Sequence, residues 1–401
     1  MSDLMQIYGG FVQEIFSTLA NTNNLSGTIL NRKWSRTSPE NSRSVKLTGT
    51  VHISLIGKAN AALARYDGLL QGIINPEILL SPLTIREAVL SSRIEGTQAS
   101  LEDVLQFEAD ETHMITPEKR LDIQEILNYR TALKAAVVDL QKRPICTNMI
   151  RDLHRILLAS VRGRDREPGE IRRIQNYIAP YGTPIERATF IPPAPDLVPD
   201  ALTNWENYLH AEEKDPLVQL ALLKAQFELI HPFRDGNGRI GRMLVPLILY
   251  DKHILSTPMF YISAYLESHR DEYYKRLLAV SRDDDWNRWI AFFLQALTEQ
   301  ATENNQKATA IMGLYEEMKK QVPEVTHSQY SVQAIDTLFS RPIFNTADFI
   351  AESRIPKQSA HRILRGLADN GILVVTREGK GKSPAIFRFS RLILITEAGS
   401  R

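Results

Sequence analysis

The sequence predicts a mainly α-helical protein that carries one short β-hairpin and a small C-terminal unit of three helices and two strands. Most of the chain has apolar residues at helical spacing, whereas strand-forming residues gather in two places, 176–195 and 372–389. At 401 residues the chain is long enough for two or three domains with a substantial core.

Composition excludes several classes of protein. Lys and Arg together number 48 and Asp and Glu 47, so a net charge of +1 implies no general electrostatic partner. The single Cys146 allows no internal disulfide and no cysteine metal cluster. The N-terminus has no apolar signal segment, and no apolar run approaches the ~18 residues that span a bilayer. We therefore expect a cytoplasmic protein that does not enter a membrane.

The predicted elements follow in order. Residues 1–120 form an N-terminal helical region, interrupted by a polar loop at 31–44, and residues 121–300 form a helical core. The helices expected in the core are 121–140, 147–161, 199–210, 217–230 and 239–252. Residues 176–195 are rich in Pro and β-formers and predict a short hairpin, and residues 301–325 read as a polar helical connector.

Residues 326–395 read as a separate unit that resembles a winged helix-turn-helix. Its predicted helices and strands are 332–339, 346–352, 356–370, 372–377 and 385–389. From residue 326 to the end there are 11 Lys/Arg and 6 Asp/Glu, which gives +5. The candidate DNA contacts are Lys357, Gln358, His361, Arg362, Arg365, Lys380 and Lys382. Winged helices also dock proteins, so the pattern leaves DNA and protein partners open.

The segment from His231 to Arg242 concentrates chemistry in twelve residues. The run 235–238, with two glycines around an asparagine, is expected to be a non-helical turn that opens a buried helix. Such a turn presents unpaired backbone N–H groups at the positive end of a helix dipole, so it can bind an anion. His231, at the end of the preceding apolar helix, can accept a proton from an incoming hydroxyl.

Two arginines and one carboxylate complete the predicted anion site. Arg239 and Arg242 lie one turn apart on one helix face, so both guanidinium groups can reach one polyphosphate. Asp235 would repel phosphate unless a Mg²⁺ ion bridged them, because hard cations take both kinds of oxygen. The pattern therefore predicts a site for a nucleoside triphosphate with Mg²⁺.

The segment 231–242 resembles the full signature of the Fic domain family, His-x-Phe-x-(Asp/Glu)-Gly-Asn-Gly-Arg-x-x-Arg. Residues 150–157 and 168–172 resemble that family's upstream core helix and turn, and 190–199 resembles its substrate-clamping flap. The resemblance implies a Fic-type helical core and transfer of AMP from ATP to a Tyr, Thr or Ser hydroxyl of a target protein. Gly238 favours this reaction, since relatives that transfer a phosphoryl group have Lys there.

The resemblance also implies roles for residues. His231 would be the base, Asp235 the Mg²⁺ ligand and Asn237 a contact to the α-phosphate, while Arg239 and Arg242 would hold the β- and γ-phosphates. The ATP-binding residues that it implies are Glu95, Arg187, Ala188, Thr189, Phe190, Gly236, Asn237, Gly238, Arg239, Ile240, Gly241, Arg242, Tyr273 and Tyr274. One of the two tyrosines at 273 and 274 could instead pack in the core.

A second short motif concerns regulation. Ser91 and Glu95 lie four residues apart at the end of an apolar helical run, and Gly96 suits the cap that follows. The usual meaning of such a pair is a solvated helix end. Beside a Fic core it resembles the family's inhibitory helix, whose Glu would pair with Arg242 and occupy the guanidinium that the γ-phosphate needs.

Three functions remain open from the sequence. The first is a protein adenylyltransferase restrained by Glu95, acting as a monomer or a homodimer. The second is a DNA-binding regulator that senses a nucleotide without catalysis, which the presence of the base His231 disfavours. The third is removal of AMP from modified proteins with the help of Glu95. The motifs do not identify the target protein or the acceptor residue.

Overall fold

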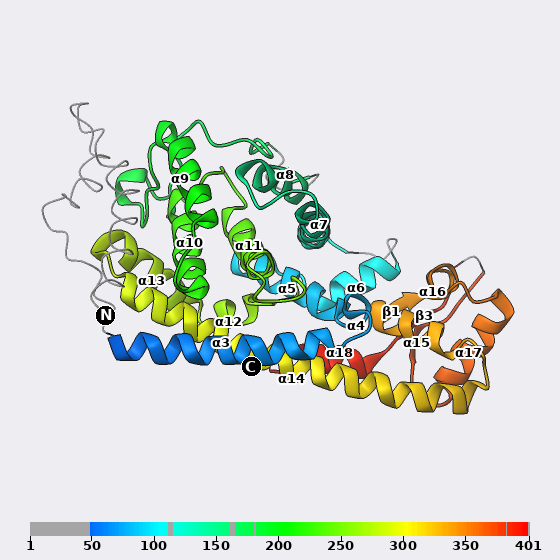
Figure 1. Cartoon of the computed structure of the whole chain (residues 1–401). Helices are drawn as coiled ribbons and strands as arrows, with labels where there is room; N and C mark the ends of the chain where they lie inside the picture. The colour runs from blue at the N-terminus through cyan, green and yellow to red at the C-terminus, as the bar shows by residue number, and fades with distance from the viewer. Residues whose placement is uncertain (1–48, 111–114, 160–164, 180–181, 382, 400–401) are drawn as a thin grey trace, which may run out of the picture. The chain divides into compact units, whose positions relative to one another are not determined.

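The structure is a computed structural model, and it describes residues 49–110, 115–159, 165–179, 182–381 and 383–399. The predicted polar loop at 31–44 and Lys382 lie outside these residues. Helices dominate, and the three named strands of the described residues form one small sheet (Figure 1), which confirms the mainly α-helical fold class. Within the described ranges, no helix combines the length and apolar content needed to cross a bilayer.

The described residues divide into two compact units, each of which is assembled from separate stretches of the chain. Of the described residues, the motif unit comprises those within 49–61, 132–253 and 269–298. The C-terminal unit comprises those within 62–131, 254–268 and 299–399. The segment 231–242 therefore belongs to the first unit, and the inhibitory motif at Ser91–Gly96 belongs to the second.

Helix α10 (Pro216–Ile230) is the centre of the motif unit. Almost every residue of this helix is buried, including Gln219, Lys224 and Gln226, so neighbouring helices surround it. Asp215 caps its first turn by accepting from the N–H groups of Leu217 and Val218 at 3.0 and 2.9 Å. A central helix with no solvent-facing side can hold residues at its C-terminal end in fixed positions.

The neighbours of α10 are helices from the whole length of the motif unit. Helix α11 (Asn237–Asp251) packs beside it (Figure 1), as do α9 (Val198–His210) and α13 (Arg270–Asp283). Two buried indoles bond to its backbone: Trp205 Nε1 donates to Leu223 O at 2.9 Å and Trp289 Nε1 donates to Ala221 O at 2.7 Å. Helix α8 (Thr147–Leu157) contacts α9 and α11.

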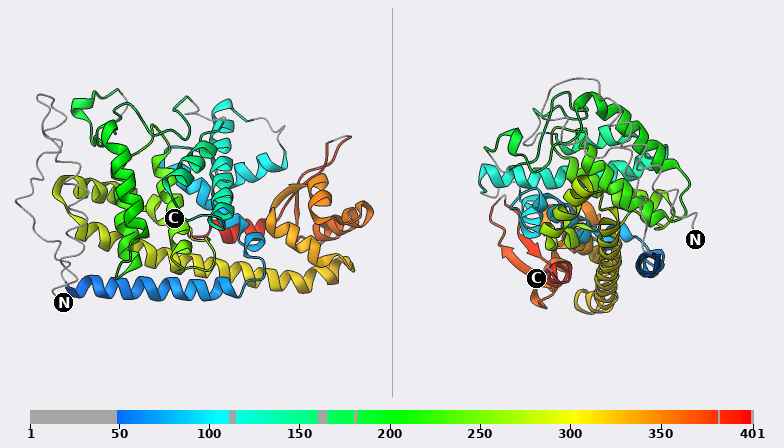
Figure 2. Two further views of the ribbon diagram at one scale, coloured as in Figure 1. Left: turned by 45° about the horizontal axis from the view of Figure 1, so that its top comes forward. Right: turned by 90° about the vertical axis from the view of Figure 1, so that its left-hand side faces the viewer.

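Three long helices contribute residues to both units by sequence. They are α3 (Gly49–Gln71), α7 (Pro117–Leu140) and α14 (Trp286–Thr326). Figure 2 shows α14 as one continuous helix, so the expected connector at 301–325 is the continuation of the helix that begins in the core.

The C-terminal unit contains a three-stranded antiparallel sheet in the order β1-β3-β2. Its strands are β1 (Ile343–Asn345), β2 (Val374–Arg377) and β3 (Ile386–Arg388). The associated helices are α15 (Ser331–Ser340), α16 (Thr346–Ser353), α17 (Lys357–Asp369) and α18 (Ser390–Glu397). Strand β1 was not predicted, because three residues between two helices carry no period-2 signal.

The N-terminal part of the C-terminal unit packs on that sheet and its helices. Helix α5 (Ser81–Ile94) contacts α12 (Ser263–Ser268), α15 and α18, α6 (Leu101–Ala109) contacts β1, and α4 (Pro76–Leu79) contacts α15. Two ion pairs join α6 and the residue after it to the strands, Arg388–Glu102 at 2.6 Å and Arg377–Asp110. The segment with the inhibitory motif and the last 70 residues thus share one core.

Some predicted boundaries were wrong. Helix α8 ends at Leu157 instead of residue 161. Helix α11 begins at Asn237, so Asn237 and Gly238 are helical and the turn expected at 235–238 is confined to Asp235 and Gly236. Gly236 alone supplies the positive φ, at 77°, that reverses the chain. Pro246 lies inside α11 without ending it.

Candidate active site

His231 occupies the C-cap of α10 in the left-handed region, with φ 50° and ψ 60°. This conformation turns the chain out of the helix, and its ring Nδ1 lies 3.2 Å from the carbonyl oxygen of Glu228. A carbonyl oxygen only accepts, so Nδ1 carries the hydrogen in this contact. In the neutral ring the lone pair is therefore on Nε2, which makes Nε2 the basic atom.

The loop that follows is closed by hydrogen bonds to its own backbone. The Asn237 side chain accepts from the N–H of Phe233 and donates to its carbonyl, both at 2.8 Å, and the Asn176 amide donates to the same carbonyl at 3.0 Å. Asn237 is 2% exposed, so its side chain fixes the loop. A contact from Asn237 to a phosphate would have to come from its backbone or the remaining side-chain N–H.

Asp235 and Gly236 form the entrance to α11. The Asp235 Oδ1 atom accepts from Gly236 N at 2.6 Å and lies 3.4 Å from Arg239, and the Asp235 side chain is 45% exposed. A Cβ at Gly236 would lie 3.3 Å from Leu157 and 3.4 Å from His154, in addition to the strain of a positive φ. The position therefore needs glycine. The first turn of α11 presents backbone N–H groups that the helix itself leaves unpaired.

His154, on α8, ties this loop to the turn at 167–170. Its Nδ1 accepts from Gly169 N at 2.8 Å, so its Nε2 carries the hydrogen and donates to Asp235 O at 2.9 Å. The ring also stacks on Phe233 with centroids 3.8 Å apart. Burial lowers the pKa of His154 to about 4, so the ring is neutral at pH 7 and can make both bonds.

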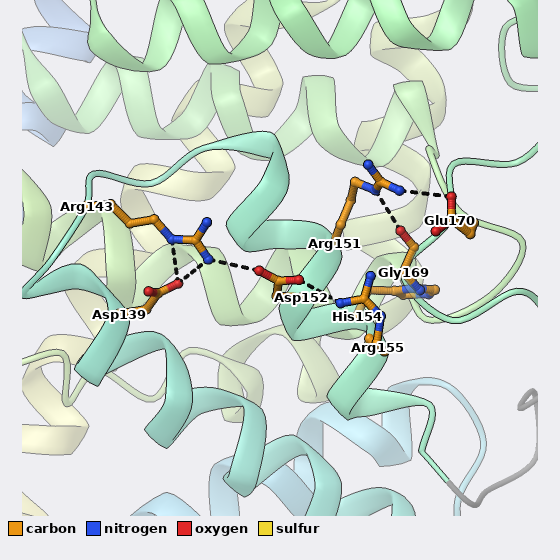
Figure 3. Close-up of polar contacts among 8 residues, drawn as sticks. All are labelled: Asp139, Arg143, Arg151, Asp152, His154, Arg155, Gly169 and Glu170. Carbon is orange, nitrogen blue, oxygen red and sulfur yellow. Dashed lines mark hydrogen bonds and ion pairs between the residues drawn. The ribbon is translucent and has the colours of Figure 1, made fainter.

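The turn at 167–170 is held by a second residue of α8 (Figure 3). Arg151 donates through Nε to Gly169 O at 2.8 Å and pairs with Glu170 at 2.9 Å. On the same helix Asp152 bridges Arg155 and Arg143 at 2.6 and 2.9 Å. Arg151 and His154 reach the turn from successive turns of one rigid helix, which fixes its position.

Arg172, immediately after that turn, supports the backbone of the motif from behind. Its side chain donates to His231 O at 2.8 Å and to Pro193 O at 2.6 Å, and its backbone N–H donates to Pro232 O at 2.9 Å. The residue is 1% exposed. One guanidinium thus connects the backbone of His231 to Pro193 in the predicted flap, and no role was predicted for Arg172 or for His154.

The flap is a narrow loop closed by one bridge between Ile178 and Phe190. Ile178 N donates to Phe190 O at 2.9 Å, and Thr189 N donates to Ile178 O at 2.9 Å. Arg282 of α13 donates to Thr189 O at 3.3 Å. The hairpin predicted at 176–195 is therefore present in minimal form. Ala188 is buried and Ile178 is 45% exposed, so the loop has one side against the protein and one side toward solvent.

A buried charge cluster lies beneath the motif, between α10, α11 and α13. Lys224 forms an ion pair with Glu228 one turn away and donates to Tyr273 OH at 3.0 Å. Burial raises the pKa of Glu228, but Lys224 and Arg242 outweigh it, and the net pKa lies below its usual value. A Cβ at Gly241 would lie 2.6 Å from a Glu228 oxygen, so only glycine lets α11 approach this closely.

The structure places most of the predicted motif residues in one region. Residues 231–242 form a continuous loop and helix start, with Arg239 at 3% and Arg242 at 1% exposure. Tyr273 is 1% exposed with its hydroxyl committed to the charge cluster, so it packs in the core. Tyr274 is 41% exposed, and its role in ATP binding stays a prediction.

The inhibitory motif has the local geometry that the sequence predicts. Helix α5 ends at Ile94, Glu95 is its C-cap, and Gly96 follows with φ 107°. Ser91 is completely buried, whereas Glu95 and Gly96 at the end of the helix are exposed. Glu95 and Arg242 belong to different compact units, and their pairing stays a prediction.

Two consecutive segments of the chain match the models of known protein families. Residues 53–138 match the family described as Fic/DOC family N-terminal, and residues 144–249 match the Fic/DOC family. A protein adenylyltransferase Fic of Drosophila grimshawi is 32% identical over 207 residues, which are 49% of this chain and 36% of that protein. A probable protein adenylyltransferase of Aquifex aeolicus is 35% identical over 85 residues, 21% of this chain and 27% of that one. The chain thus spans about a third of the curated relatives it matches.

Solved structures share the fold at low sequence identity. A Fic family protein from Desulfovibrio desulfuricans G20 aligns with a TM-score of 0.54 at 20% identity, covering 85% of this chain and 96% of that one. A Fic domain containing signaling protein from Bacteroides thetaiotaomicron aligns with a TM-score of 0.51 at 19% identity, over 64% of this chain and 97% of that one. The matched segments show that the chain carries the N-terminal and core domains of the Fic/DOC family, and the solved structures show that its fold is shared with Fic proteins.

Proposed function

We propose that this protein is a protein adenylyltransferase that transfers AMP from ATP to a Tyr, Thr or Ser hydroxyl of a target protein. The observation that carries the proposal is the His231 ring. Its Nδ1 faces the carbonyl of Glu228 at 3.2 Å, which assigns the lone pair of the neutral ring to Nε2. A nucleotide sensor needs an anion site but no oriented base, so a fixed tautomer favours catalysis.

The anion site adjoins the base. The start of α11 offers backbone N–H groups at the positive end of a fifteen-residue helix, and Arg239 and Arg242 project from its first two turns. In the proposed reaction these groups hold the phosphates and stabilise the charge that moves onto pyrophosphate. His231 takes the proton of the hydroxyl as its oxygen attacks the α-phosphorus and the bond to pyrophosphate breaks.

The residues present fit a Mg²⁺ ion only when a nucleotide supplies further ligands. Among the described residues no group of three or more His, Cys, Asp or Glu side chains could hold a metal alone. Asp235 has a half-exposed carboxylate, and its Oδ1 is engaged by Gly236. One carboxylate plus phosphate oxygens is a common Mg²⁺ arrangement, and the ion would neutralise phosphate charge there.

The flap supports a protein substrate. Its bridge at Ile178 and Phe190 is a single pair, and Tyr177 and Ile178 are 43% and 45% exposed. An extended segment of a target can add to such an edge through backbone hydrogen bonds, which gives affinity without a demanding sequence. The target would then present its hydroxyl to Nε2 of His231.

Regulation is the finer part of the proposal. In it Glu95, at the end of α5, pairs with Arg242 and denies that guanidinium to the γ-phosphate. The Glu95→Gly change tests this cleanly, because Glu95 is a C-cap outside the helical interior and is followed by a glycine with positive φ. The substitution therefore removes the carboxylate with little cost to the helix.

The experiment measures AMP transfer from α-labelled ATP with Mg²⁺ in cell lysate, read by gel and intact mass. The variants are the unaltered protein, Glu95→Gly, Glu95→Gly/His231→Ala, and Glu118→Gly as a control that removes an exposed carboxylate from α7. We expect strong label only with Glu95→Gly, none in the double variant, and the unaltered rate in the control.

Each alternative gives a different pattern. Label that persists without His231 would refute its role as the base. Equal label with and without Glu95 would refute the brake while leaving the transferase intact. Loss of label from a premodified target, dependent on Glu95, would assign AMP removal. Measurable ATP binding with no label in any sample would refute transfer altogether.

A further inference from the structure

Residues 326–401 hold 11 Lys/Arg and 6 Asp/Glu, and their positive charges are unevenly distributed. Four of its arginines have carboxylate partners: Arg341 with Glu352, Arg377 with Asp110, Arg388 with Glu102 and Arg391 with Glu317. Their positions are explained by the packing of the C-terminal unit, since Arg388 binds Glu102 in the first turn of α6 and Arg377 binds Asp110, which follows that helix. These side chains are used for structure.

Most of the other cationic side chains lie on one face of α17 and in the turn before it. Helix α17 buries Ala360, Ile363, Leu364 and Leu367, and the opposite face of its first nine residues is exposed. That face consists of Lys357, Gln358, His361, Arg362 and Arg365, and the exposed Arg354 stands in the turn before it. Among the residues that the structure describes, none of these cations forms an ion pair with a carboxylate.

The elements around α17 give this face a defined setting. The order α15, β1, α16, α17, β2, β3, with the sheet order β1-β3-β2, is the order of a winged helix-turn-helix. Lys380 and Ser383 bond to each other's backbone at 3.0 Å in both directions, which closes the turn between β2 and β3. In that motif the second helix of the turn enters a DNA groove and its N-terminal residues read the bases.

The chemistry of the face favours nucleic acid over protein. The large exposed apolar residues of this region are Val332, Val374 and Leu394, and none of them lies on α17. Protein interfaces have an apolar centre depleted in Lys, whereas this face is polar throughout and carries Lys357, Arg362 and Arg365. Arg and Gln side chains form bidentate hydrogen bonds with guanine and adenine in the major groove of B-form DNA, which is wide enough for a helix. The major groove of A-form RNA is too narrow for a helix, so the face favours DNA over double-stranded RNA.

We propose that the exposed face of α17, with Arg354 and Lys380, is a binding surface for double-stranded DNA in the major groove. It does not depend on AMP transfer, because no residue of 231–242 takes part. If about four phosphates are neutralised, affinity should fall about 100-fold between 50 and 200 mM salt.

The test uses the full chain and a fluorescently labelled 24-base-pair duplex of mixed sequence, with anisotropy read at 50, 100 and 200 mM NaCl. Arg362→Glu/Arg365→Glu reverses two charges on the proposed face. Lys319→Glu/Lys320→Glu reverses two exposed charges on α14 of the same unit and is the matched control. His231→Ala is included to separate this binding from the proposed reaction, and a poly-glutamate peptide of equal charge is the competing probe.

We expect the unaltered protein, the α14 control and His231→Ala to bind alike, and the α17 variant to bind at least tenfold more weakly with a reduced salt slope. Absence of binding at 50 mM would overturn the proposal. Equal losses in both charge-reversal variants would show that net charge, not this face, attracts DNA, and would also overturn it. If poly-glutamate bound as tightly as the duplex, the partner would be an acidic protein.

Discussion

Replacing Lys224 with Met leaves the Glu228 carboxylate buried without the cation that pairs with it. The two side chains are 1% and 10% exposed, and Tyr273 OH, which accepts from Lys224, lies 3.3 Å from the same carboxylate oxygen. Met matches the length of the lysine stem, so the change removes charge rather than volume. Breaking a buried pair by removing one partner costs about 3–5 kcal/mol.

The loss should depend on pH in a direction that identifies its cause. In the unaltered protein burial raises the pKa of Glu228, but Lys224 and Arg242 lower it by more, so the folded pKa lies below the unfolded one. The pair then contributes stability above the unfolded pKa, and this contribution is lost as pH falls through the folded pKa. In the variant, burial outweighs the remaining positive charge, so the pKa of Glu228 should rise above its usual value. The cost of burying the ionised carboxylate should then increase as pH rises.

The assay is urea unfolding of both proteins at pH 7, 5.5 and 4. The difference in unfolding free energy should be largest at pH 7 and shrink toward pH 4, where the carboxyl is protonated in the variant. Lys320→Met removes an exposed cation from α14 and should change stability by less than about 0.5 kcal/mol. A difference below about 1 kcal/mol at pH 7, or one independent of pH, would refute the role assigned to this pair.

Three further outcomes follow from contacts in the motif unit and one glycine of α14. Burial lowers the pKa of His154 from 6.5 to about 4, so the folded state binds fewer protons and loses stability as pH falls. Urea unfolding should show a loss of about 2 kcal/mol from pH 7 to 5, absent in His154→Gln. Gly241→Ala should lower the melting temperature, because the added Cβ would lie 2.6 Å from a Glu228 oxygen. Gly313→Ala should raise it, because the added Cβ has no atom within 4 Å and Ala favours the helix. Equal shifts in the two variants would contradict the close contact between Gly241 and Glu228. In Arg172→Lys the single ammonium group cannot donate to His231 O and Pro193 O together, as the guanidinium does. The rate of AMP transfer should therefore fall at least tenfold while ATP affinity changes less. An unchanged rate would show that Arg172 does not position His231.

Residues with their own chemistry were the ones that the sequence could predict. The order of His231, Asp235, Arg239 and Arg242 in the sequence is not one that helix or turn formation requires, so it indicated a binding site. The spacing of apolar residues predicted the helices around them. His154, Arg172 and the pair Lys224–Glu228 went unrecognised, because their roles depend on partners far away in the chain. The signal for the pair was present, since Lys224 and Glu228 lie four residues apart and are the two charged residues of the run at 217–230.

The start of helix α11 is a feature that the sequence could not predict. Gly238 was expected to be part of a turn, but one glycine at 236 is enough to reverse the chain, and the second can then join the helix. Propensity alone does not say which of two nearby glycines takes the positive φ. That choice is made by packing, since the space at Gly236 is limited by Leu157 and His154 on α8.

Helix α5 is held so firmly that it cannot act by melting. Eleven of its fourteen residues are buried, Glu87 accepts from both the N–H and the hydroxyl of Ser263 at 2.9 and 2.6 Å, and Arg86 reaches Glu303 at 3.4 Å. Unfolding it would strand these charges and expose an apolar surface, a cost comparable to the stability of a domain. If Glu95 restrains Arg242 as proposed, a signal that governs Glu95 has to act on α5 as an intact helix within the C-terminal unit. A ligand bound at α15 or α18 would then act on the helix that carries Glu95, because both of these helices pack on α5.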